Sequence, residues 1–294
     1  MAALAQSCWP AAEFFVGQAF EMSTLKIYGD EAGTMPLDDG GDVFTAACLS
    51  FRDEAPPLDR FRGTLDWLVE YVRACGAVPM VCFVRPRSGY GDAVKAKVSK
   101  TDTMARATRL LTGANASYLP VRGIGDRNWV WTECMFQAIG CSIFAGLARW
   151  KIEAVNIVLD EKSFPSDYRT TIRTRLPLLR GLLEQQVKAF GSANPAAGQL
   201  MLRRFAFSDT DITLQWSDES GARSSSDGLR LADLLASSCR QALMKPEARI
   251  AVPELMAAVG EDYLIDVTDV LMRPVSAANI ETWRRNTGLP EPRA

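Results

Sequence analysis

Acidic residues at the end of a predicted strand are the groups in this sequence best suited to chemistry. The run 25–28 (LKIY) predicts a strand, and Asp30 and Glu31 follow it after Gly29 and before Gly33. A strand end is rigid and the turn after it is open to solvent, so a side chain there is both aimed and accessible. Two adjacent carboxylates in this place indicate a binding site for a divalent cation.

Two further aspartates occupy comparable settings later in the chain. Asp160 ends the apolar run 154–159 (AVNIVL), and Asp233 lies inside the helical segment 229–236 (LRLADLLA). Two-metal phosphoryl transfer uses carboxylates that converge from separate elements onto ions roughly 3.5–4 Å apart. Asp30, Asp160 and Asp233 are therefore the predicted metal ligands.

The composition narrows the possible chemistry because the chain contains no histidine. Ser-His and Cys-His nucleophilic pairs, imidazole bases and histidine-ligated zinc are thereby excluded. Hard oxygen ligands favour magnesium, manganese or calcium over zinc, and we expect Mg²⁺ or Mn²⁺. A net charge of −2, from 33 basic and 35 acidic residues, creates no global field that attracts nucleic acid.

Each aspartate also has a local alternative role. Asp30, before a turn, is placed to accept hydrogen bonds from nearby backbone amides. Asp160, followed by Glu161 and Lys162, is equally consistent with a solvated strand exit. Asp233 is the only polar residue within 231–236, and burial of an unpaired carboxylate is costly, so it must meet a cation, a donor or solvent.

The predicted elements alternate between strands and helices, which indicates an α/β domain over residues 22–245. The predicted strands are 25–30, 42–51, 77–84, 154–160, 201–207 and 212–216, the first two forming a hairpin. The predicted helices are 57–75, 100–112, 126–150, 167–189 and 227–244. Residues 246–294 are expected to be a C-terminal elaboration packed on this domain.

Residues 1–21 are expected to lie outside the fold. They lack a basic amino-terminal region and carry Glu13 and Glu21, so they make a poor secretory signal. The seven cysteines form no C-x-x-C pair and are interpreted as small buried hydrophobes in a reducing compartment. The apolar stretch 135–147 is too short for a bilayer, which needs about 20 residues, so a cytoplasmic protein without a membrane segment is predicted.

The segment 85–100 is the strongest local concentration of basic residues, with Asp92 as its one acid. Arginines and lysines around a Gly-Tyr-Gly turn could contact phosphates, with Tyr90 free to stack on a base. The alternative, which the sequence favours, is a solvated mobile loop. Nucleic acid is thus a possible partner through this segment, and the oligomeric state is left open.

Taken together, the acidic motifs resemble the domain-of-unknown-function family 3800. The segment 30–33 (DEAG) stands where that family has D-E-S-G, and 231–236 (LADLLA) is similar to its late L-A-D-x-x-A helix. Asp160 matches its strand-ending acid. The glutamate of a short E-x-K-like element is missing near Lys95–Lys100. The resemblance covers about residues 24–244.

This resemblance implies a ribonuclease H-like fold, a mixed sheet flanked by helices. Such folds place acids on the first strand, a long middle helix, the fourth strand and the last helix. Asp30, Asp160 and Asp233 take three of these places, and Glu133 can take the fourth. The alternative for Glu133 is an early-helix acid favoured by the helix dipole, and the alternative for Glu31 is a supporting role.

Two functions follow as expectations. The first is a metal-dependent nuclease or phosphodiesterase that uses Asp30, Asp160 and Asp233, with Glu31 or Glu133 completing the metal's ligands. The second is a noncatalytic module of the same fold that binds nucleic acid or a protein partner. The sequence leaves open whether the substrate is RNA, DNA, a hybrid or a small phosphodiester.

Overall fold

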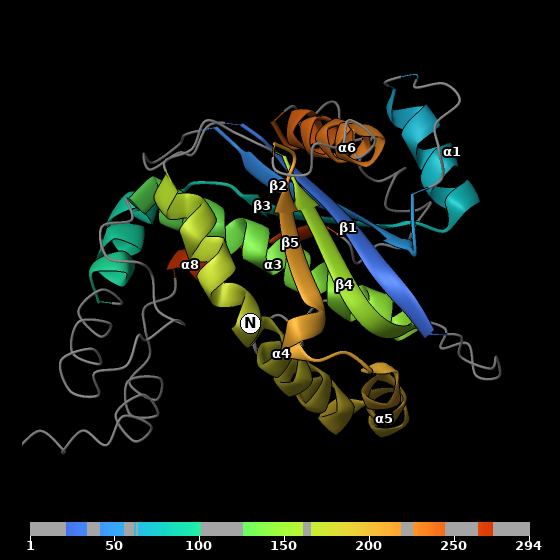
Figure 1. Cartoon of the computed structure of the whole chain (residues 1–294). Helices are drawn as coiled ribbons and strands as arrows, with labels where there is room; N and C mark the ends of the chain where they lie inside the picture. Colours follow the sequence, from blue (N-terminus) through green and yellow to red (C-terminus); the bar gives the residue numbers. More distant parts are fainter. Residues whose placement is uncertain are drawn as a thin grey trace, which may run out of the picture.

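A mixed β-sheet with helices on both faces forms the core of the computed structural model (Figure 1). The residues that the structure describes are 22–33, 42–55, 62, 64–100, 126–160, 166–218, 226–244 and 264–272. Residues 1–21, most of the predicted helix 100–112 and most of the C-terminal region 246–294 lie outside them.

The sheet has six strands in the order β5-β4-β1-β2-β3-β6. The strands are β1 (Met22–Ala32), β2 (Phe44–Arg52), β3 (Val78–Val84), β4 (Lys151–Leu159), β5 (Ile212–Trp216) and β6 (Leu264–Asp266). β2 is antiparallel to β1 and β3, whereas β1, β4 and β5 are parallel to one another. The predicted α/β class and the β1–β2 hairpin are confirmed.

The helices divide between the two faces of the sheet. They are α1 (Leu65–Cys75), α3 (Asp126–Arg149), α4 (Ser166–Ala193), α5 (Pro195–Arg204), α6 (Ser226–Met244) and α8 (Thr268–Met272). Side chains alternate between the faces along a strand. Tyr28 meets Gly228 of α6, whereas the next residue, Gly29, meets Met135 of α3. α6 and α3 therefore cover opposite faces of β1, as Figure 1 shows.

α3 is a long helix that packs against the sheet, and its apolar segment is longer than the stretch 135–147 identified from the sequence, which corrects that estimate of length. Within the described residues, its segment Trp129–Arg149 is the one stretch long and apolar enough to cross a membrane. Of the 18-residue stretch that meets this criterion, 94% is buried inside the fold. Packing against the sheet accounts for this apolar surface, because strands covered on both faces need an apolar partner on each.

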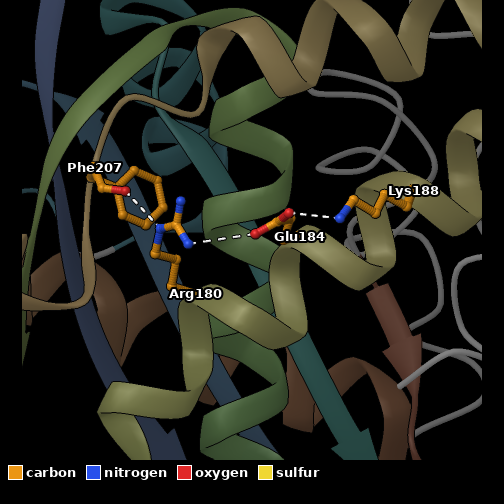
Figure 2. A network of polar contacts seen from close by, with 4 residues as sticks. All are labelled: Arg180, Glu184, Lys188 and Phe207. Atoms are coloured by element: carbon orange, nitrogen blue, oxygen red, sulfur yellow. Dashed lines mark hydrogen bonds and ion pairs between the residues drawn. The ribbon is translucent and has the colours of Figure 1, made fainter.

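α4 is joined by polar contacts to the segment that follows α5. Arg180 Nε donates a hydrogen bond of 2.9 Å to the Phe207 carbonyl oxygen, and its guanidinium lies 3.4 Å from Glu184 (Figure 2). Lys188 pairs with the same glutamate at 2.7 Å. The two ion pairs have i,i+4 spacing on one helix face, so they support the helix locally and link it to its neighbour.

The basic segment 85–100 is not a loop throughout, which corrects the prediction. Residues 90–100 are helical. Tyr90, Val94 and Val98 recur every four residues and are buried, so a helical apolar face was present among the lysines. Tyr90 is fully buried and cannot stack on a base.

Several cations of this segment bind the C-terminal part of the chain. Arg85 donates a hydrogen bond of 3.0 Å to the Leu243 carbonyl oxygen. Lys97 donates one of 2.7 Å to a carbonyl oxygen of α8, and Arg87 pairs with Asp269 of the same helix. The contacts of Lys97 and Arg87 attach α8 to the domain, next to the point where β6 extends the sheet beside β3, whereas that of Arg85 reaches the end of α6.

Two further element predictions are corrected. The predicted strand 201–207 is mostly helix α5, in which Met201 and Arg204 are buried at helical spacing. Only Phe205 forms an isolated bridge with β4. Of the predicted helix 57–75, the structure describes α1, which begins at Leu65 because Thr64 Oγ1 caps it by accepting a hydrogen bond from a first-turn amide. Residues 57–61 and 63 lie outside the described residues.

Candidate functional site

Asp30 and Asp160 lie side by side at the carboxyl ends of two neighbouring parallel strands. Gly29 of β1 stands opposite Leu159 of β4, and the Asp160 N–H donates a hydrogen bond of 3.2 Å to the Gly29 carbonyl oxygen. Paired residues of adjacent strands point to the same face of a sheet. Because Tyr28 faces α6, the two aspartates also leave the sheet on the α6 face.

Asp30 is held in a nearly buried position, with 4% of its surface exposed. Its Oδ1 accepts a hydrogen bond of 2.7 Å from the Glu31 N–H. This is the local backbone contact that the sequence suggested as an alternative role. An ionised carboxylate has two oxygens with about four acceptor sites in all.

Asp160 is half-buried and receives a hydrogen bond from the next strand. Ser217 follows β5, and its hydroxyl donates to Asp160 Oδ1 at 3.1 Å. Within the described part of the chain, Asp160 Oδ2 has no hydrogen-bond or ion-pair partner. Ser217 was missed by sequence reasoning, although it directly follows a correctly predicted strand.

A third acid, Asp218, also lies at this edge of the sheet and was not singled out from the sequence. Its carboxylate pairs with Arg169 of α4 at 2.8 Å. The Arg169 guanidinium lies 5.0 Å from the centre of the Trp216 ring. Asp218 therefore has a cationic partner within the protein.

Asp233 lies on the exposed side of α6. Gly228 contacts Tyr28, and Thr45, which stands opposite Ala32, donates a hydrogen bond of 3.0 Å to a carbonyl oxygen in the middle of α6. These two contacts place the middle of the helix, including Asp233, at the level of Asp30 along β1. Solvent satisfies the Asp233 carboxylate, one of the outcomes expected from the cost of burial.

Glu133 and Glu31 lie toward the other face of the sheet. Glu133 of α3 forms an ion pair with Arg175 of α4, and each side chain is only 16% exposed. The Arg175 guanidinium also lies 4.6 Å from the centre of the Phe136 ring. Glu31 is buried and, by strand alternation, points away from the face that carries Asp30.

The structure thus brings Asp30 and Asp160 together at neighbouring strand positions. It places Glu133 and Glu31 toward the other face of the sheet, and it places Asp233, the third predicted ligand, on the exposed side of α6. Among the described residues, no group of three or more Cys, Asp and Glu side chains is arranged to hold a metal ion. Mg²⁺ is commonly bound by one or two carboxylates and several waters, so the Asp30–Asp160 pair still fits such an ion. The hard oxygen donors suit Mg²⁺ and Mn²⁺ equally.

Comparison with known protein families, with curated proteins and with solved structures gives no match to this chain. The resemblance to the domain-of-unknown-function family 3800 therefore stays a prediction based on the short acidic motifs. The positions of the acids at the strand ends are the basis for a functional conclusion.

Proposed function

We propose that this protein is a divalent-metal-dependent nuclease or phosphodiesterase whose ion is bound by Asp30 and Asp160. The observation that supports this proposal most is the position of the two aspartates, in register on adjacent parallel strands and on one face of the sheet. One or two carboxylates together with water molecules are the usual protein ligands of Mg²⁺.

The residues of the chain would have distinct roles at this site. Asp30 and Asp160 would fix the ion's position because Asp30 lies in β1 and Asp160 directly follows β4, whereas Asp233, on the exposed side of α6, stays in contact with solvent. A bound Mg²⁺ or Mn²⁺ supplies an activated water and stabilises charge on a phosphoryl oxygen. With no histidine in the chain, proton transfer falls to carboxylates and water.

We also propose that the fold is ribonuclease H-like. The support is the order of the acids on the observed elements: Asp30 after the core of β1, Glu133 on α3, Asp160 after β4 and Asp233 on α6. That order follows the ribonuclease H-like pattern which the sequence motifs resemble. The pairing of Glu133 with Arg175 departs from a metal-binding role for that residue.

Mn²⁺ titration by calorimetry tests the proposed function. Wild-type protein should bind Mn²⁺, and Asp30→Asn and Asp160→Asn should each weaken binding at least tenfold, because each removes a charged ligand. Asp92→Asn, a change at an exposed aspartate on another element, should bind as the wild type does.

Activity is measured in parallel on single- and double-stranded DNA, RNA and a hybrid, with Mn²⁺ or with a chelator. Cleavage should require the metal and should be lost in both variants. A wild-type protein that neither binds Mn²⁺ nor cleaves any of these substrates would overturn the proposal.

The second candidate is a noncatalytic binding module, favoured by the cationic partners of nearby acids. Asp218 pairs with Arg169 and Glu133 with Arg175, which shows that arginines neutralise acids at this end of the sheet. Such a module should bind nucleic acid or a protein partner equally well in a chelator. Its thermal midpoint should not rise with added Mn²⁺, whereas a metal enzyme should be stabilised by its ligand.

A further inference from the structure

We propose that Ser217 is a positioning residue that orients the Asp160 carboxylate for cation binding. This inference rests on the proposed function, because it concerns the same ion. It adds a residue from a third strand, β5, to a site that the sequence built from Asp30 and Asp160.

The three residues form a row across the sheet. Leu159 stands opposite both Gly29 of β1 and Trp216 of β5. The residues that follow, Asp30, Asp160 and Ser217, are consequently neighbours at the carboxyl ends of three parallel strands. Hydrogen bonds continue the ladder on both sides of Asp160, because Ser217 N–H donates to the Leu159 carbonyl oxygen at 3.0 Å.

Ser217 is itself held in place by its neighbours in sequence. Trp216 is 1% exposed, and Asp218 pairs with Arg169, whose guanidinium lies over the Trp216 ring. The backbone on either side of Ser217 is therefore fixed by packing and by an ion pair. A hydroxyl on a fixed backbone can restrict the rotation of its acceptor.

The hydrogen bond from Ser217 uses Asp160 Oδ1 at 3.1 Å and leaves Oδ2 without a partner among the described residues. An acidic side chain fixed through one oxygen loses less conformational freedom when its other oxygen binds an ion. Carboxylate ligands of metals are commonly hydrogen-bonded in this way, and loss of such a partner weakens metal binding about 10- to 100-fold.

Four variants test this role by Mn²⁺ calorimetry and need no activity. Ser217→Ala removes the hydroxyl, Ser217→Cys keeps the size but donates weakly, and Ser217→Thr retains a hydroxyl. Thr213→Val is the matched control, since Thr213 Oγ1 donates a hydrogen bond of 2.7 Å to Asn156 between the same two strands.

The alanine and cysteine variants should raise the Kd for Mn²⁺ about tenfold or more, the threonine variant should restore the wild-type value, and the control should leave it unchanged. Equal weakening by Thr213→Val would show a general effect of strand pairing and overturn the inference. Wild-type affinity in Ser217→Ala and Ser217→Cys, with binding lost in Asp160→Asn, would overturn the inference alone. No Mn²⁺ binding by the wild type would overturn the proposed function and this inference together.

Discussion

Gly228 of α6 lies directly against the ring of Tyr28 in β1. A Cβ atom at Gly228 would stand 2.5 Å from three carbons of that ring, closer than any normal contact. The absence of a side chain therefore sets how closely α6 approaches the sheet. That distance matters for the candidate site, because α6 covers the face of the sheet on which Asp30 and Asp160 lie.

Gly228→Ala should destabilise the protein. The added methyl group must displace either the helix or a buried ring, and overpacking of this kind costs about 1–3 kcal/mol. Gly181→Ala on α4 is the control, since a Cβ atom there would meet nothing within 4 Å and alanine is the better helix former. Urea denaturation should show a loss for the first variant and none for the second. Equal stability of the two variants would contradict the close packing of α6.

The sequence predicted those elements whose pattern is local. Three elements are recognisable from the spacing of their apolar residues and from the turn or cap residues beside them. They are the hairpin of β1 and β2, the strand before Asp160 and the long helix from Asp126. Segment 85–100 was misread because its glycines, proline and lysines outweighed the spacing of Tyr90, Val94 and Val98. Segment 201–207 was misread because its β-favouring aromatic residues outweighed the helical spacing of the residues before them.

Only those features of the candidate site that depend on local sequence patterns were predictable. Asp160 follows β4 and Asp30 lies near the end of β1, which continues to Ala32, and strand ends are approximately recognisable from sequence. Which strands lie side by side depends on tertiary packing, so the neighbouring place of Ser217 was not predictable. The partner of Glu133 is a residue 42 positions away on another helix, which no local pattern indicates.

Glu133→Gln should lower stability without lowering Mn²⁺ affinity. It removes the charge from a largely buried ion pair and leaves Arg175 without its partner, which costs about 1–3 kcal/mol. The double variant Glu133→Gln/Arg175→Met should recover part of that loss, since no unpaired charge then remains buried. Chemical denaturation and Mn²⁺ calorimetry provide the two measurements. A folded Glu133→Gln protein that binds no Mn²⁺ would restore Glu133 as a ligand.

If the protein binds nucleic acid through segment 85–100, Lys95 and Lys100 should carry the contact, because both are exposed whereas Arg87 and Lys97 bind α8. Lys95→Ala/Lys100→Ala should then weaken binding. It should also reduce the slope of log K against the logarithm of the salt concentration by about 1.4–1.8, because two phosphate contacts are lost. Arg203→Ala, an exposed arginine on α5, should leave the slope unchanged. An unaltered slope in the double lysine variant would remove this segment from the interface.

Stability should fall at alkaline pH because of buried thiols. Cys239 is buried on α6, as the sequence predicted for the cysteines, and burial raises its pKa from 9.0 to about 12. Between these values the unfolded chain loses a proton that the folded protein keeps, so the free energy of unfolding decreases as pH rises, by at most about 1.4 kcal/mol per pH unit for one thiol. Urea denaturation should show that the free energy of unfolding of Cys239→Ala falls less steeply than that of the wild type from pH 9 to pH 11. Below pH 8 the two proteins should show the same dependence on pH. Parallel curves over the whole range would show that this thiol is not protected from ionisation by the fold.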